Sequence, residues 1–199
     1  MKSNDSVVEI VSIIDQSGSM EMIRDDAIGG FNAFLGQQQE LGGLANLTLV
    51  LFDHRYEVPV DGVAIQDVPR LDRKSFVPYG NTGLYDAIGR ALTDLEKKNP
   101  EKAIIQIITD GAENSSKEFT QAVVKEKIKA AEARGWEVIF LAANIDAFAA
   151  GGGLGISGSN TYAFAASAQG THDAFATMSM RSSSYRCEPL QPLTTAKTN

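Results

Sequence analysis

The sequence contains one cysteine, Cys187, and only two histidines among its 199 residues. A single cysteine excludes a disulfide bond within the chain. The chain is nevertheless long enough, and at 43% hydrophobic residues apolar enough, to bury a full core without cross-links or structural metals. We therefore expect a globular fold held together by packing.

The sequence also lacks any run of Lys or Arg, and its formal net charge is −7. Because nucleic acids and anionic membranes attract proteins mainly through clustered positive charge, we expect neither as a partner. Residues 1–10 lack the apolar core of a signal peptide, and no apolar stretch approaches the length of a membrane span. The simplest expectation from these absences is a cytoplasmic protein.

What the sequence does contain is an alternation of apolar strands and amphipathic helices. The predicted strands cover residues 7–14, 47–53, 56–60, 103–109, 137–143 and 161–166, and the main helices lie near residues 23–35, 84–95, 117–134 and 171–185. Continuous apolar runs are typical of parallel strands buried on both faces, whereas Pro59 belongs on an edge strand. The pattern predicts an α/β fold: a doubly wound, mainly parallel six-stranded sheet with one antiparallel edge strand and helices on both faces.

No internal repeat or domain boundary interrupts this pattern. We predict a single domain over residues 1–185 and a flexible tail over residues 186–199, which show no periodicity. Gly29 and Gly30 interrupt the first helix, which predicts close packing of that helix against the sheet. The glycines of residues 151–155 do not match the dinucleotide fingerprint G-x-G-x-x-G, so we interpret them as a flexible connection.

Polar residues gather where the predicted strands end. Asp15 and Asp110 each stand at the end of a strongly apolar strand, where α/β proteins place their sites beyond the carboxyl ends of the sheet. Ser17 and Ser19 share the loop of Asp15, and Thr82 precedes the helix that begins near residue 84. Two carboxylates and three hydroxyls provide only oxygen ligands, which suit Mg²⁺ or Mn²⁺ and disfavour zinc and copper.

Three short segments now stand out together: "DQSGS" at residues 15–19, "GNTG" at 80–83 and "TDG" at 109–111. Together they resemble the metal-ion-dependent adhesion site of von Willebrand factor type A domains, and the resemblance spans about residues 7–185. It implies that Ser17, Ser19 and Thr82 bind a metal ion directly. Asp15 and Asp110 would bind it directly or through water, and an Asp or Glu carboxylate of a protein partner would fill the last coordination position. The chain is most similar to intracellular, bacterial or phage-like single-domain members of the family, some of which work with ring-forming ATPases.

Two other interpretations of the same residues stay open. Serines after a strand often cap the next helix, and an aspartate at a strand end often closes a turn. A metal-dependent phosphohydrolase would also place Mg²⁺ at strand ends, but it needs a nucleophile or base beside the ion. The segment "DQSGS" lacks the second aspartate of an aspartyl phosphatase, no G-x-S-x-G motif is present, and His54 and His172 lack partners at catalytic spacing.

We therefore expect a binding module rather than an enzyme, with an adaptor role in an intracellular assembly as its most specific form. The chain has no Walker A loop, so any ATP hydrolysis in such an assembly would belong to the partner.

Overall fold

A computed structural model describes residues 6–188 and contains one six-stranded sheet in the order β3-β2-β1-β4-β5-β6. The strands are β1 (Val8–Asp15), β2 (Ala45–Phe52), β3 (Tyr56–Ala64), β4 (Lys102–Thr109), β5 (Glu137–Ala142) and β6 (Thr161–Ala163). Only the pairing of β2 with β3 is antiparallel; the other neighbouring strands run parallel. The predicted mainly parallel sheet with one antiparallel edge strand is confirmed.

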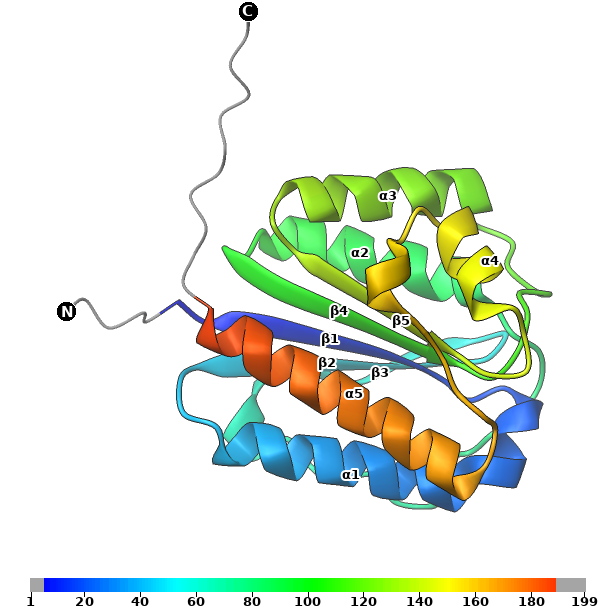
Figure 1. Ribbon diagram of the computed structural model, residues 1–199, viewed down its shortest axis with the longest axis horizontal. Helices are drawn as coiled ribbons and strands as arrows, with labels where there is room; N and C mark the ends of the chain where they lie inside the picture. The colour runs from blue at the N-terminus through cyan, green and yellow to red at the C-terminus, as the bar shows by residue number, and fades with distance from the viewer. Residues whose placement is uncertain (1–5, 189–199) are drawn as a thin grey trace, which may run out of the picture.

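Helices cover both faces of this sheet (Figure 1). One face carries α1 (Arg24–Glu40) and α5 (Ala168–Cys187), and the other carries α2 (Leu84–Lys98), α3 (Gln121–Ala133) and α4 (Ala147–Gly153). Short 3-10 helices occupy Gly18–Ile23, Ile65–Asp67 and Gly158–Asn160. No helix within residues 6–188 is long and apolar enough to cross a membrane.

Strand β4 explains why the predicted strands are apolar without alternation. Every residue of β4 is buried. Ile104 and Ile108 pack into the core under α1 and α5, whereas Ile105 and Ile107 pack into the core under α2 and α3. A central strand between two helical layers has no solvent-facing side, so both of its faces must be apolar.

The edge strand β3 contains Pro59, as predicted, but extends to Ala64 rather than ending near residue 60. Two register shifts against β2 allow the pairing to continue past the proline. Proline, the charged side chains of Glu57 and Asp61, and the register shifts all discourage another strand from pairing with this edge.

Two predictions about glycine are corrected by the packing. A Cβ on Gly30 would lie 2.3 Å from the Phe175 ring, so the close contact of α1 is with α5 and not with the sheet, while Gly29 faces open space. The glycine segment near residue 151 is not a loose connection, because Gly151 belongs to α4 and a Cβ there would lie 2.7 Å from the Thr161 hydroxyl.

The packed structure also continues beyond Tyr185, where we predicted the tail to begin. Helix α5 ends at Cys187. Arg186 is only 9% exposed, and its guanidinium donates to the carbonyls of Gln38 in α1 and of Gly43 just after α1. Cys187 itself is exposed. Residues 189–199 of the predicted tail lie outside the described residues.

Candidate metal centre

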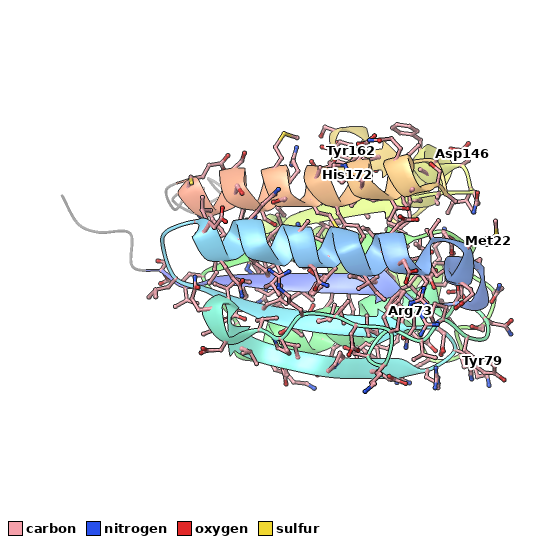
Figure 2. The ribbon with its side chains drawn as sticks, turned by 90° about the horizontal axis from the view of Figure 1, so that it is seen from below. Met22, Arg73, Tyr79, Asp146, Tyr162 and His172 are labelled. Atoms are coloured by element: carbon pink, nitrogen blue, oxygen red, sulfur yellow. The ribbon has the colours of Figure 1, made fainter. Side chains whose placement is uncertain are left out.

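The loops after β1 and β4 lie side by side, because the two strands are parallel neighbours and their carboxyl ends coincide. Asp15 is the last residue of β1, and Asp110 directly follows β4. These two strands are neighbours at the switch point of the sheet, where successive strands stop being added on the β2 side of β1 and begin to be added on the β4 side. This is the place where α/β sheets leave a crevice at the carboxyl ends of their strands. Figure 2 shows Met22, just after the first loop, and Tyr79, in the second loop, at this end of the molecule.

The structure brings all five predicted positions together. The hydroxyls of Ser17 and Ser19 are 3.1 Å apart, and the Ser19 hydroxyl donates to Asp110 Oδ1 at 2.6 Å. The backbone N–H of Ser17 donates to Asp15 Oδ1 at 2.6 Å. A Cβ on Gly111 would lie 3.2 Å from the Thr82 hydroxyl, so glycine lets this oxygen approach the third loop, and the same position lies 3.7 Å from the Ser19 hydroxyl.

Both carboxylates of the site are buried: Asp15 is 0% and Asp110 2% exposed. Burial raises the pKa of Asp15 to about 6 against hydrogen bonds from Thr109 and Ser17, and the nearby negative charge of Asp110 raises it further. Burial also raises the pKa of Asp110, opposed by the Ser19 hydroxyl. Among residues 6–188, no Lys, Arg or His side chain forms an ion pair with either carboxylate. Two buried negative charges without a cationic partner are unfavourable unless a cation joins them.

The second loop is held against the first by backbone hydrogen bonds. Gly18 N–H donates to the Gly80 carbonyl at 3.0 Å, and Tyr79 N–H donates to the Gln16 carbonyl at 2.8 Å. Gly80 has φ +72°, and a Cβ at this position would lie 2.3 Å from His54 Nδ1. Glycine is therefore required both by the backbone conformation and by the neighbouring ring.

The third loop fixes the position of Thr82. Asn114 Oδ1 accepts from Thr82 N–H at 2.9 Å, and Asn114 N–H donates back to the Thr82 carbonyl at 3.0 Å. The same loop is anchored to α2 by Asp86, whose carboxylate accepts three backbone N–H groups from residues 117–119. Burial raises the pKa of Asp86, but these three donors outweigh it and hold the pKa below its usual range.

Sequence reasoning missed two of these supporting residues. The Thr109 hydroxyl donates to Asp15 Oδ2 at 2.6 Å. The only sequence signal for this role was the position of Thr109 directly before Asp110. Asn114 had no sequence signal, because its role depends on a contact with a residue 32 positions away.

The histidines differ in their relation to the site. His172 is exposed and lies 3.5 Å from Asp173 on α5. His54 lies in the turn between β2 and β3: its Nδ1 is 3.3 Å from Asp53 Oδ1, and its ring centroid is 5.8 Å from that of Tyr79. Its ring supports the second loop at Gly80.

The donor set fits a hard divalent cation. Within residues 6–188 no cluster of three or more His, Cys, Asp or Glu side chains is able to hold a metal ion, so a metal here would depend on hydroxyls and water as well as on Asp15 and Asp110. Oxygen-only coordination with few carboxylates suits Mg²⁺ or Mn²⁺, which commonly retain water ligands.

No family model matches the chain, and no curated protein matches its sequence. Several solved structures are similar in shape. The von Willebrand factor domain of the type V pili tip protein Mfa5 from Porphyromonas gingivalis aligns with a TM-score of 0.67 and 13% identity, over 92% of this chain and 97% of that one. The PilB minor pilin from Streptococcus sanguinis gives 0.71 and 11%, over 96% of this chain and 64% of that one.

A third similar structure is proximal thread matrix protein 1 from the mussel byssus, which has a zinc-occupied metal-ion-dependent adhesion site. It aligns with a TM-score of 0.62 and 12% identity, over 92% of this chain and 47% of that one. The chain thus spans between about half and two thirds of the length of PilB and of the byssus protein. At such low identities the likeness concerns the fold, and the chain has a fold like that of von Willebrand factor type A domains.

Proposed function

We propose that the chain is a metal-dependent protein-binding domain. Asp15, Ser17, Ser19, Thr82 and Asp110 would hold Mg²⁺ or Mn²⁺, and an Asp or Glu carboxylate of a protein partner would take the open coordination position. The observation that carries the proposal is the convergence of two buried carboxylates and three hydroxyls with no ion-pairing cation among residues 6–188. The metal-occupied site of the byssus protein supports it by analogy of fold.

The burial of the five residues suggests where a partner would approach. Asp15, Ser17, Thr82 and Asp110 are all at most 3% exposed, whereas Ser19 is exposed. A partner would therefore reach the ion from the side of Ser19. In this proposal the three hydroxyls bind the ion directly, and the aspartates supply charge directly or through water.

Titration calorimetry with Mg²⁺ and with Mn²⁺ tests the metal site. We expect one site of modest affinity, abolished in the Ser17→Ala/Ser19→Ala double variant. The chain offers a matched control in Ser157 and Ser159, another exposed Ser-x-Ser pair, whose hydroxyls lie 2.9 Å apart at the start of the 3-10 helix Gly158–Asn160. Unchanged binding in the Ser17→Ala/Ser19→Ala variant, or equal losses in both double variants, would contradict the proposed site.

Affinity capture from the source cells, with Mg²⁺ and with chelator, tests the protein partner. Capture should need the metal and fail with Thr82→Ala, which removes a hydroxyl but none of the backbone bonds of its loop. An ATPase among the captured proteins would support the adaptor role. Cell fractionation tests the cytoplasmic location, which the pilus proteins among the similar structures leave open.

A metal-dependent phosphohydrolase is the second candidate, because His54 lies beside the second loop. The contacts of the His54 side chain, however, are with Gly80, Asp53 and Tyr79, which are not among the five proposed metal ligands. We expect no turnover of p-nitrophenyl phosphate in Mg²⁺ or Mn²⁺. Turnover lost in both Asp15→Ala and His54→Ala would favour the enzyme instead.

A further inference from the structure

A second concave feature adjoins the candidate metal centre. A pocket of about 340 Å³, which we call the flanking pocket, is lined by Gln16, Arg55, Glu57, Lys74, Ser75, Val77, Pro78 and Tyr79. Gln16 lies between Asp15 and Ser17 in the sequence, so the pocket wall continues directly into the first site loop. The volume is at the lower end of the roughly 300–1,000 Å³ typical of ligand pockets and is suited to one large side chain.

Apolar surface is left open to solvent in this pocket. The Val77 side chain is 48% and the Tyr79 side chain 63% exposed, with Pro78 between them. Exposed aromatic and Arg side chains beside a concave surface are typical of the residues that contribute most to protein interfaces. Figure 2 shows Tyr79 projecting at the end of the molecule that carries the site.

The pocket is preformed. Phe76, only 1% exposed, anchors the segment that carries Val77 and Tyr79, and its carbonyl accepts from Arg24 Nε at 3.0 Å. Tyr79 is held to the first loop through the Gln16 carbonyl. Because these bonds exist before any partner binds, little ordering would be needed on association.

The charges around the pocket already compensate one another. The Arg55 guanidinium binds the buried carboxylate of Asp53 at 2.6 Å, lies 3.5 Å from Glu57, and sits 5.8 Å from the centre of the Tyr79 ring. Lys74 forms no ion pair within the described part of the chain, and its backbone N–H donates to Asp72 Oδ1 at 2.9 Å. Arg55 and Lys74 in the lining would repel an added positive charge, and the carboxylates of Glu57 and Asp53 beside Arg55 would repel an added negative one.

We propose that the flanking pocket receives an uncharged aromatic side chain from the same partner whose carboxylate binds the metal. The inference rests on the proposed function and makes it more specific, since the recognised element becomes an acidic residue with an aromatic residue near it in the sequence. The ring would pack on Tyr79 and Val77 and against the guanidinium plane of Arg55, which its carboxylate partners hold in place.

Short peptides test the pairing of the two sites. The probes are acetyl-Asp-Phe-amide and acetyl-Asp-Gly-Phe-amide, which cover two spacings, and their counterparts with Ala, Glu or Lys in place of Phe. Affinities are measured by nuclear magnetic resonance titration of the ¹⁵N-labelled protein in saturating Mg²⁺. We expect at least one Phe peptide to bind about fivefold more tightly than its Ala, Glu and Lys counterparts, with backbone amide shifts at Gln16, Arg55 and Tyr79.

Variants separate the pocket from the metal centre. Tyr79→Ala should remove the advantage of Phe over Ala, whereas Phe148→Ala, which truncates another exposed aromatic side chain outside the pocket, should preserve it. Calorimetry on the same samples should show unchanged Mg²⁺ binding in both variants.

The outcomes distinguish the two proposals. Equal binding of Phe and Ala peptides by metal-loaded protein, tighter binding of a Glu or Lys peptide, or no peptide binding at all would overturn the inference and leave the metal site standing. Absence of Mg²⁺ and Mn²⁺ binding by the parent protein would overturn the proposed function, and the inference with it.

Discussion

Without metal, the protein should lose stability between pH 5 and pH 7.5 because Asp15 must carry its charge in a buried position. Burial raises the pKa of this carboxyl from 3.8 to about 6. A carboxyl whose pKa is raised on folding stabilises the fold below its unfolded pKa, and this contribution is lost as the pH rises through the folded pKa. The loss therefore begins near pH 3.8 and is nearly complete above pH 7.

The size of the effect follows from these two pKa values. The rise in the pKa of Asp15 from 3.8 to about 6 corresponds to about 3 kcal/mol of lost stability at full ionisation, of which about 1 kcal/mol falls between pH 5 and pH 7.5. Asp15→Asn should not show this part of the pH dependence. The amide oxygen accepts from Ser17 N–H, and the amide nitrogen donates to the Thr109 hydroxyl, which turns to donate to the Gly111 carbonyl 3.1 Å away.

The assay is urea unfolding of the parent and the variant in chelator at both pH values. The parent should lose about 1 kcal/mol more than Asp15→Asn between pH 5 and pH 7.5. Asp94→Asn, which changes an exposed carboxylate paired with Lys97, should follow the parent. Adding Mg²⁺ at pH 7.5 should stabilise the parent and not Asp15→Asn. Parallel pH dependences of the parent and Asp15→Asn would refute the reasoning about the buried charge.

Further predictions concern three other positions. Asp110→Asn should lose Mg²⁺ affinity in calorimetry yet match or exceed the parent's melting temperature in chelator, because the Ser19 hydroxyl still has an oxygen to donate to; a clear loss with an unchanged Mg²⁺ response would indicate a turn residue instead. Gly80→Ala should lower the free energy of unfolding by about 1–3 kcal/mol, and adding His54→Ala should restore part of it, since only the backbone strain then remains; no gain from the second change would contradict the predicted clash. Arg186→Ala should lower the free energy of unfolding in urea by about 2–3 kcal/mol, because the carbonyls of Gln38 and Gly43 lose a charged donor. A change of less than about 0.5 kcal/mol, as is usual for surface substitutions, would show that water replaces the guanidinium.

The sheet was predictable because its strands carry strong local signals. The continuous apolar runs at β1 and β4 are typical of buried parallel strands, and Pro59 indicated that β3 is an edge strand. The ends of elements were less predictable: α5 reaches Cys187 because Arg186 finds carbonyls of α1, and no local pattern reports such a contact. For the same reason Gly30 could be identified as a close-packing position but not assigned to its partner, Phe175.

The site divides in the same way. Asp15, Ser17 and Ser19 lie in one short segment, and the rule that parallel strands share an edge was enough to bring Asp110 near them. The residues that hold the loops in place were not predictable. Asn114 and His54 act through contacts with Thr82 and Gly80, which exist only once the loops are assembled.

The two ends of the described chain lie near each other at the end of the molecule opposite the candidate metal centre (Figure 1). Val8 pairs in register with Lys102, whose ammonium donates to the Glu188 carbonyl at 2.6 Å. A unit whose two connections emerge side by side is suited to insertion into a surface loop of a carrier protein. Grafted in this way through two short linkers, residues 6–188 would present the candidate metal centre on the side away from the carrier.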